Sequence, residues 1–324
     1  MVVLMSTLNV ERCFALDNDP YSSWGVDPEN AASIHVTSSW MQLSPKHSVV
    51  VAVVDTGLDK DHPFLTKNQY VLMDFSQAKV VKNSADDLHG HGTHVAGIIR
   101  SIFPSVKLMA LKYFNPAASG VESLNATLKA LKFAVDAGVD IINYSGGGPE
   151  ASAEELSILK EAEAKGILVV CAAGNDGTNI DNHKNAFYPA SYGLSNIISV
   201  SAYDSELKTV SSSNFGTQLV HISAPGYRIK SSLPHGRAGY LTGTSQATAF
   251  VTGVAAVIKS QFPDLSVAEI KESIISTAKK EEQFNSINKS SGRLDAIKSL
   301  VYARDMINNR KLANVDQKEM RKVQ

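Results

Sequence analysis

The chain has 324 residues, and its 31 basic and 32 acidic side chains leave a formal net charge of −1. This balance gives no bulk electrostatic attraction to nucleic acid or to a membrane surface, and no apolar run is long enough to span a bilayer. The 44% of hydrophobic and 19% of charged residues are typical of a globular protein. The length favours one large α/β domain and also allows two.

The N-terminus and the two cysteines bear on the cellular compartment. Residues 1–8 are mildly apolar, but they lack a positively charged start and a long apolar core, so they carry no readable secretion signal. The compartment therefore stays open: cytoplasmic as written, or secreted if the N-terminus is incomplete or processed. Cys171 lies in an apolar run and is expected to be buried, whereas Cys13 lies in the leader. One disulfide between them stays open, but two cysteines do not make a disulfide framework.

Five apolar runs rich in β-branched residues alternate with segments of helical period. As expected for strands buried on both faces, these runs are bounded by Gly, Pro, Asp or Asn and cover residues 48–55, 106–114, 139–145, 166–173 and 196–202. Between them, helical spacing marks residues 91–100, 121–137 and 151–165. This alternation predicts a three-layer α/β/α fold around a mainly parallel, doubly wound sheet.

The C-terminal third is expected to be helical over residues 245–261, 266–279 and 292–306. Ser266 and Glu269 form the pattern of a capping box, which marks one of these helix starts. No Pro-, Gly- or Ser-rich linker interrupts the chain before these helices end. We therefore expect a leader, one domain, and a polar tail that is a surface helix or frayed, over residues 1–19, 20–303 and 304–324.

A serine with chemical potential stands in Gly-Thr-Ser-Gln-Ala-Thr-Ala, residues 243–249. Ser245 follows a Gly-Thr turn and precedes an apolar helical run, so its hydroxyl and its backbone N–H lie at the positive end of a helix dipole. This position suits the nucleophile of an acyl-transfer enzyme, because the helix dipole and the free N–H stabilise the negative charge of the oxyanion that develops there.

A serine hydroxyl becomes a nucleophile only when a histidine takes its proton and a carboxylate orients that histidine. Asp55 ends the strongest predicted strand, where ligands gather in parallel sheets; taken alone, an Asp at a strand end is more often a structural cap or turn residue. His91 begins a helix between two glycines, which suits a general base. A metal site shared with His89 and His94 is the alternative, but no nearby carboxylate or cysteine completes a ligand set.

Asn175 follows the fourth predicted strand in Ala-Ala-Gly-Asn. Its side-chain amide can donate to an oxyanion, with the backbone N–H of Ser245 as a second donor. In isolation, an Asn at this position favours an ordinary turn.

Four segments in this order resemble the subtilisin-like serine proteases, the subtilase family. They are Val-Ala-Val-Val-Asp-Thr-Gly-Leu-Asp, His-Gly-Thr-His-Val-Ala-Gly, Ala-Ala-Gly-Asn and Gly-Thr-Ser-Gln-Ala-Thr, at residues 51–59, 91–97, 172–175 and 243–248. The order Asp, His, Ser is that of subtilisin. The resemblance implies that Asp55, His91 and Ser245 form a catalytic triad, that Asn175 is the oxyanion donor, and that the fold is subtilisin-like.

The same resemblance implies how a substrate would bind. Ser145, Gly146 and Gly147 resemble the backbone segment that pairs with the substrate before the scissile bond. Residues 119–121, which are Ser119, Gly120 and Val121, resemble a strand on the substrate's other side. An extended peptide would add as a strand between them. The implied partners are an extended peptide or unfolded protein, and a propeptide or a proteinaceous inhibitor; the implied enzyme is a monomeric endopeptidase that forms an acyl-enzyme.

Several positions depart from the family pattern. Gln246 replaces the usual Met after the nucleophile, which predicts resistance to peroxide because the oxidisable thioether is gone. Ala249 and Phe250 replace a Pro-His pair; we expect changed packing and an unchanged mechanism. Phe187 falls at the floor of the pocket for the residue before the cut, called P1, and Asp176 at its rim, so small or medium P1 residues should be preferred.

The resemblance also bears on calcium. Many subtilisins carry a calcium-binding loop after the histidine helix, but residues 100–107 are short here, and Phe64 stands where those proteins often place a carboxylate. A hard cation needs several oxygen ligands, so we expect no required cofactor and no high-affinity calcium site, while a weaker site elsewhere stays open. Two alternatives to the endopeptidase remain: a catalytically silent binding protein, and a peptide-processing transamidase or macrocyclase on the same site.

Overall fold

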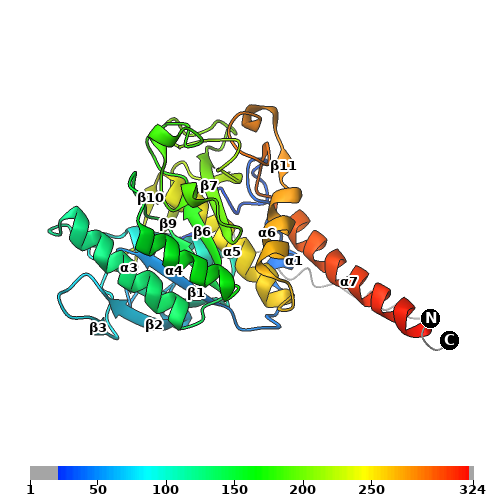
Figure 1. Cartoon of the computed structure of the whole chain (residues 1–324), viewed down its shortest axis with the longest axis horizontal. Coiled ribbons are helices and arrows are strands. Elements are labelled where there is room, and N and C mark those ends of the chain that lie inside the picture. Colours follow the sequence, from blue (N-terminus) through cyan, green and yellow to red (C-terminus); the bar gives the residue numbers. More distant parts are fainter. Residues whose placement is uncertain (1–20, 321–324) are drawn as a thin grey trace, which may run out of the picture.

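The computed structural model describes residues 21–320, with side chains described throughout except at residue 38 and residues 314–320. The expected leader and Cys13 therefore lie outside the described residues. A ten-stranded sheet forms the middle layer, in the order β11-β12-β8-β7-β6-β5-β1-β4-β2-β3. Its inner strands pair in parallel, and the two edge strands, β3 and β11, pair antiparallel. The fold is the expected three-layer α/β/α arrangement (Figure 1).

The elements have the following bounds. The strands are β1 Val50–Asp55, β2 Gln69–Asp74, β3 Val81–Lys82, β4 Lys107–Lys112, β5 Ile141–Tyr144, β6 Leu168–Ala172, β7 Ile197–Tyr203, β8 Ile222–Pro225, β9 Ile229–Leu233, β10 Arg237–Leu241, β11 Lys279–Lys280 and β12 Gly292–Arg293. The helices are α1 Ser38–Met41, α2 His91–Ile102, α3 Gly120–Asp136, α4 Ala153–Ala164, α5 Thr244–Gln261, α6 Val267–Ser276 and α7 Ala296–Met320. Short 3-10 helices occur at Thr66–Asn68, His183–Asn185, Ala190–Tyr192 and Glu282–Phe284.

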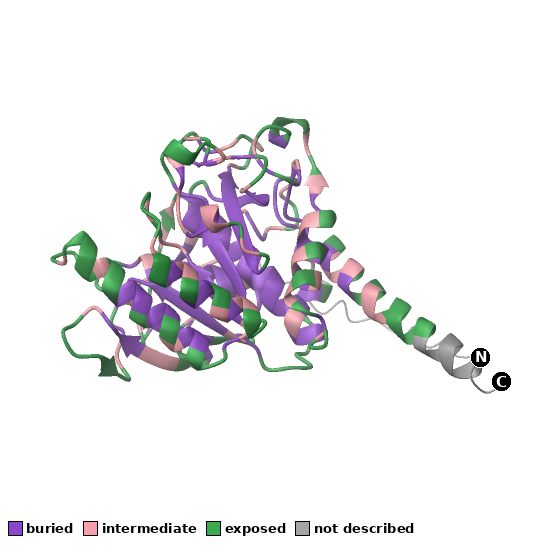
Figure 2. Ribbon diagram, viewed as in Figure 1, coloured by how far each residue is buried: buried purple, intermediate pink, exposed green. Residues whose placement is uncertain are grey.

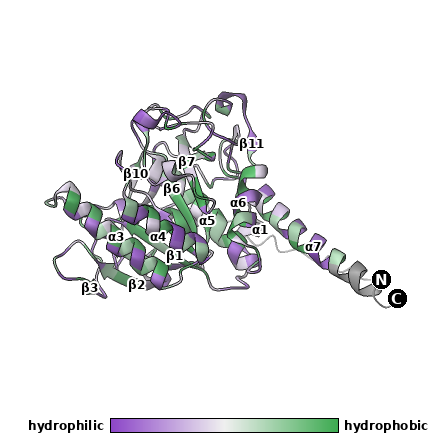
Figure 3. Cartoon of the chain, in the orientation of Figure 1, coloured by the Kyte–Doolittle hydropathy of each residue, from purple (hydrophilic) through white to green (hydrophobic). Residues whose placement is uncertain are grey.

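Strand β1 shows why the layers form. Its side chains alternate: Val51 and Val53 belong to the core that α2 and α5 cover, whereas Ala52 and Val54 belong to the core under α3 and α4. A strand whose side chains are apolar on both faces needs helices on both sides. Figure 1 shows α3 and α4 side by side in front of the sheet, and Figure 3 shows their apolar and polar positions alternating along the helices.

Helix α5 is the central helix of the molecule. Every one of its residues except Lys259 is buried, and Figure 2 shows it almost wholly in the buried colour. It packs against α2 and against strands β5 to β8. A helix buried all round has little freedom to shift, so its first turn is a rigid place for a functional group.

The C-terminal region differs in two ways from the sequence-based prediction. Residues 292–293 form strand β12, which pairs with β11 and β8, so the helix expected over residues 292–306 begins only at Ala296. That helix, α7, then runs through residue 303 as far as Met320 and extends away from the body (Figure 1). Within residues 21–320, no helix is both long and apolar enough to cross a membrane.

Candidate active site

The site lies where three neighbouring parallel strands end. Asp55 is the last residue of β1, Ser145 follows β5, and Asn175 follows β6 after two residues. The register pairs Val54 with Tyr144 and Tyr144 with Cys171, which brings these strand ends to one edge of the sheet. Helices α2 and α5 pack against each other and begin at His91 and Thr244.

Asp55 and His91 form a close pair. His91 Nδ1 lies 2.7 Å from Asp55 Oδ1, and this oxygen also accepts from the backbone N–H of Thr56 at 2.7 Å. The Asp55 side chain is 3% exposed and that of His91 is 23% exposed. Burial by itself lowers the pKa of His91, but the charge and hydrogen bond of Asp55, together with the charge of Asp87, outweigh it and raise the pKa above 6.5.

Asp87 holds the first turn of α2 and was missed by the sequence analysis. Gly90, the N-cap residue, has no side chain to cap the helix, and Asp87 supplies the oxygens instead. Its Oδ1 accepts from the N–H of Gly90 at 2.7 Å and from Thr56 Oγ1 at 2.9 Å. Its Oδ2 accepts from the N–H of Thr93 at 2.9 Å. Burial raises the pKa of Asp87, but these hydrogen bonds outweigh it and lower the pKa.

The sequence carried a signal for this role. A carboxylate just before a helix that begins after a glycine can accept from the free N–H groups of the first turn. Because His91 is the first residue of that turn, Asp87 fixes the backbone from which the imidazole projects.

Ser245 is the second residue of α5 and lies against the end of β5. Its Oγ donates to the carbonyl oxygen of Ser145 at 3.0 Å, and Ser145 Oγ donates to the carbonyl oxygen of Ser245 at 3.2 Å. Ser245, the predicted nucleophile, is therefore hydrogen-bonded to the segment that is predicted to bind substrate.

Asn175 has a defined amide orientation. Its Oδ1 accepts from the backbone N–H of Thr244 at 2.9 Å and from Thr244 Oγ1 at 3.1 Å. With the oxygen engaged by Thr244, the amide nitrogen is the group left to act as a donor. The structure thus places the Asn175 donor beside the helix turn that carries Ser245.

The predicted substrate segments differ in how well they match. Residues 145–147 follow β5 and are partly exposed. Just beyond them, Gly148 forms an antiparallel bridge with Tyr188. By contrast, the strand expected over residues 119–121 is wrong. Ser119 caps α3 in a capping box with Glu122, and Gly120 and Val121 are the first residues of that helix. The Ser119 hydroxyl accepts from the Glu122 N–H, and the Glu122 carboxylate accepts from the Ser119 N–H, which is the bonding of a helix start.

Phe187 lies beside this edge. A Cβ built on Gly147 would come within 2.6 Å of Phe187 Cε1, and one built on Gly174 within 2.9 Å of Phe187 Cγ. The ring therefore fills the space between the two glycine segments that follow β5 and β6. Asp176 is exposed on the neighbouring loop, where its N–H donates to Asn214 Oδ1 at 3.0 Å.

The three clustered histidines have different surroundings. His94 is buried, and its Nε2 lies 2.9 Å from the carbonyl oxygen of Ile229 and 3.2 Å from that of Gly239; burial lowers its pKa to about 4. His89 is exposed and its ring lies edge-on to His91 and Phe114. Within the described part of the chain, no group of three His, Cys, Asp or Glu side chains is placed to hold a metal ion.

Two departures from the family pattern have visible structural effects. Only residues 103–106 connect α2 to β4, and the Phe64 ring lies under the Arg100 guanidinium at 3.7 Å. Phe250 is fully buried, and a Cβ on Gly25 would collide with its ring. The residue five positions after Ser245 thus packs against the beginning of the described chain.

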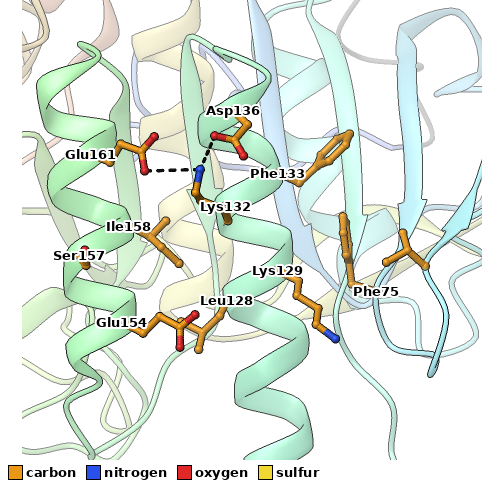
Figure 4. A pocket seen from close by; sticks show the side chains of 11 residues that line it. Phe75, Leu128, Lys129, Lys132, Phe133, Asp136, Glu154, Ser157, Ile158 and Glu161 are labelled. Atoms are coloured by element: carbon orange, nitrogen blue, oxygen red, sulfur yellow. Dashed lines mark hydrogen bonds and ion pairs between the residues drawn. The ribbon is translucent and has the colours of Figure 1, made fainter.

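A separate hollow of about 560 Å³ lies between α3 and α4. Figure 4 shows apolar side chains on its walls, among them Phe75, Phe133 and Ile158, and Lys132 paired with Asp136 and Glu161 at one end. None of the residues at the sheet edge described above lines it, so it is not part of that site.

A histidine held by a buried carboxylate, at the edge where a buried helix presents a serine, is the architecture of a serine hydrolase. The model of the Subtilase family matches residues 46–293. Subtilisin DY from Bacillus licheniformis is 35% identical over 242 residues, which cover 71% of this chain and 84% of that protein. The chain belongs to the subtilase family and is a serine-type endopeptidase.

Other relatives agree with this assignment. The major intracellular serine protease of Bacillus subtilis is 35% identical over 257 residues, covering 76% of this chain and 79% of that protein. An intracellular serine protease of Paenibacillus polymyxa is 36% identical over 248 residues, or 72% of each chain. A crystal structure of a lanthipeptide protease superposes with a TM-score of 0.72 at 23% identity, covering 86% of this chain and 93% of that one, which shows the shared fold.

Proposed function

We propose that the protein cleaves peptide bonds of extended polypeptides through an acyl-enzyme on Ser245, with His91 as general base and Asp55 as the group that orients it. The observation that carries this proposal is the 2.7 Å contact between His91 Nδ1 and buried Asp55. It fixes the ring and makes Nε2 the nitrogen that takes a proton, because Nδ1–H is donated to the carboxylate.

The reaction follows from these positions. Ser245 Oγ turns from Ser145 to the substrate carbonyl carbon, and its proton passes to His91 Nε2 as the C–O bond forms. The resulting oxyanion accepts from the Ser245 N–H and from Asn175 Nδ2. Collapse breaks the C–N bond, and the amine leaves with the proton from His91. Water then attacks the acyl-enzyme by the same route, releasing the acid and restoring Ser245.

The substrate is proposed to lie along residues 145–147 as an added strand. A Cβ at Gly146 would meet the Tyr113 hydroxyl and one at Gly147 the Tyr188 carbonyl oxygen, so these glycines let the segment lie close to its neighbours. The Phe187 ring occupies the space next to Gly147 and Gly174 where a P1 side chain would enter, and Asp176 adds negative charge at the rim. These features favour small or medium P1 residues.

We further propose that folding and activity need no high-affinity calcium. The connection of residues 103–106 has no room for an ion-binding loop, and an aromatic ring under a guanidinium at Phe64 offers no oxygen ligand. The proposed working form is a monomer, and its partners are extended peptides, unfolded proteins, and a propeptide or protein inhibitor that binds the same edge.

Covalent labelling by a fluorophosphonate tests the proposal. The purified chain should be labelled. Ser245→Ala should not be labelled, and its kcat should be about 10⁶-fold lower than that of the wild type. Thr248→Ala, a change in the same helix whose hydroxyl donates only to the Thr244 carbonyl, should keep the label. An unlabelled wild-type chain would favour a silent binding protein. Mass spectrometry of the products separates hydrolysis from transfer of the acyl group to an amine.

A further inference from the structure

Glu155 departs from the capping pattern of its own helix. The motif Ser-x-x-Glu begins three helices, α3, α4 and α6. In α3 and α6 the glutamate reaches back to the N–H of the cap serine and closes a capping box. In α4, Ser152 Oγ still accepts from the N–H of Glu155 at 3.2 Å, but Glu155 is only 4% exposed. A buried carboxyl group costs free energy unless it is hydrogen-bonded, so its burial calls for a reason.

Tyr192 takes the place of the glutamate at the start of α4. Its hydroxyl accepts from the N–H of Ser152 at 2.9 Å and donates to the carbonyl oxygen of the same residue at 3.0 Å. The Glu155 carboxyl group is hydrogen-bonded to this hydroxyl and to that of Tyr144. Burial raises the pKa of Glu155, and these two bonds offset only part of the rise. The protonated group can donate to one hydroxyl and accept from the other.

The two tyrosines belong to the two segments that are proposed to border the P1 side chain. Tyr144 is the last residue of β5 and directly precedes Ser145 in the proposed substrate segment. Tyr192 is the last residue of a 3-10 helix on the other side, and its ring lies 4.6 Å from that of Tyr188. One carboxyl group therefore joins both sides.

The turn that follows Phe187 is a tight unit. Ser191 Oγ accepts from the N–H of Phe187 at 3.0 Å, and the N–H of Ser191 donates to the carbonyl oxygen of Phe187 at 2.9 Å. Tyr188 exchanges two backbone hydrogen bonds with Gly148, at 2.8 and 3.0 Å. Because these bonds tie the turn together, a displacement of Tyr192 is expected to shift the Phe187 ring.

We propose that Glu155 is a positioning residue that sets the distance between residues 145–147 and the Phe187 ring, and with it the size of the P1 side chain that fits. This role rests on the proposed function. Glu155 acts through Tyr144 and Tyr192 and makes no contact with the substrate. When its hydrogen bonds are lost, the two sides can separate, and larger P1 side chains should be accepted.

The test measures the ratio of kcat/KM for P1 Phe to kcat/KM for P1 Ala, in two peptides that are otherwise identical. The chemical steps at Ser245 are common to both peptides and cancel in the ratio, whereas the fit of the P1 side chain does not. Glu155→Leu should raise the ratio about threefold or more, as expected for the loss of a coupling between contacting residues. Glu155→Gln should keep the wild-type ratio, because its amide can also donate to one hydroxyl and accept from the other.

Tyr192→Phe should raise the ratio as well. The double variant Glu155→Leu/Tyr192→Phe should raise it no further than either single change, because both changes break the same link. Tyr203→Phe is the matched control, since Tyr203 is fully buried and its hydroxyl donates to the carbonyl oxygen of Ala32, away from the proposed site. It should keep the ratio.

Fluorophosphonate labelling identifies the variants that keep a folded site. An unchanged ratio in either labelled single variant, Glu155→Leu or Tyr192→Phe, would overturn this role even if the thermal midpoint falls. Effects that add in the double variant, or an equal rise in Glu155→Gln, would also overturn it. A wild-type chain with no turnover and no label would instead overturn the proposed function, and this role with it.

Discussion

Ser145 and Ser245 are joined by two hydrogen bonds, each hydroxyl donating to the other residue's carbonyl oxygen, at 3.0 and 3.2 Å. In the free enzyme, the hydroxyl of the proposed nucleophile therefore donates a hydrogen bond to the segment that is proposed to bind substrate. A peptide that pairs with residues 145–147 would arrive beside this bond. In the mechanism proposed above, Ser245 Oγ leaves the Ser145 carbonyl oxygen before it attacks the substrate.

The acid limb of the pH profile should reflect His91. Only the neutral imidazole can take the serine proton, and the pKa of His91 is raised above 6.5, so kcat/KM should fall as pH drops through that raised value. Asp87→Asn removes one of the charges that raises it and should move the limb to lower pH. Asp86→Asn, the same change at an exposed neighbour, should leave it in place. Equal shifts in both variants would contradict the assignment to Asp87.

The same pKa has a consequence for stability with the opposite trend. A histidine whose pKa is higher in the folded state than in the unfolded state stabilises the fold when protonated. This contribution is complete below pH 6.5 and is lost as pH rises through the folded-state value. Urea unfolding of wild type and His91→Ala across that range should show their difference in unfolding free energy shrinking with increasing pH.

Phe187 should set the size of the preferred P1 residue. Phe187→Ala removes the ring from between Gly147 and Gly174 and should raise kcat/KM for P1 Phe relative to P1 Ala by about tenfold or more, since each apolar methylene accommodated is worth about 1–3 kcal/mol. Phe133→Ala, a similar half-buried ring in the same core layer, should leave the ratio unchanged. A wild-type peptide-library profile dominated by Phe or Tyr would contradict the prediction.

Calcium should have little effect on stability. A site present at a thousand times its Kd would add about 4 kcal/mol to the free energy of unfolding. We expect thermal midpoints in calcium and in chelator to agree. A large rise on adding calcium would show a site that the connection at residues 103–106 and the Phe64 ring do not reveal.

The activity should survive peroxide. Gln246 has no sulfur, so oxidation of the seven methionines elsewhere in the chain should leave the proposed site unmodified. Gln246→Met should instead lose activity as sulfoxide forms at residue 246, which peptide mapping can follow. Rapid inactivation of the wild type without modification of its site residues would oppose this expectation.

The sequence predicts the central layers well because their signals are local. The strand ending at Asp55 and the helix beginning near Ser245 are apolar runs between clear boundaries, and both lie within two residues of the prediction. The hairpin of β9 and β10 was missed, since Ser231 and Ser232 are polar residues buried in it. The burial of β9 comes from contact with α2, which no local pattern contains.

The two wrong predictions lie at residues 292–293 and 119–121, and the first also arises from contacts that the local pattern does not contain. Residues 292–293 form a strand because Arg293 is fully buried there, where it pairs with Glu281 and donates to the carbonyl oxygens of Ser33 and Ala31. Those partners are distant in sequence, so helical spacing alone suggests an earlier helix start. Likewise, the resemblance suggests a strand at Ser119, but the capping box with Glu122 begins α3 there.

The contact between Gly25 and Phe250 joins the first described residues to the helix that carries Ser245. Because Phe250 is fully enclosed, any side chain added at Gly25 would press on α5 little more than one turn beyond Ser245. The N-terminal segment is thus matched to this particular helix. Segments exchanged between subtilases with different residues at these two positions would fit the fold yet misplace the serine.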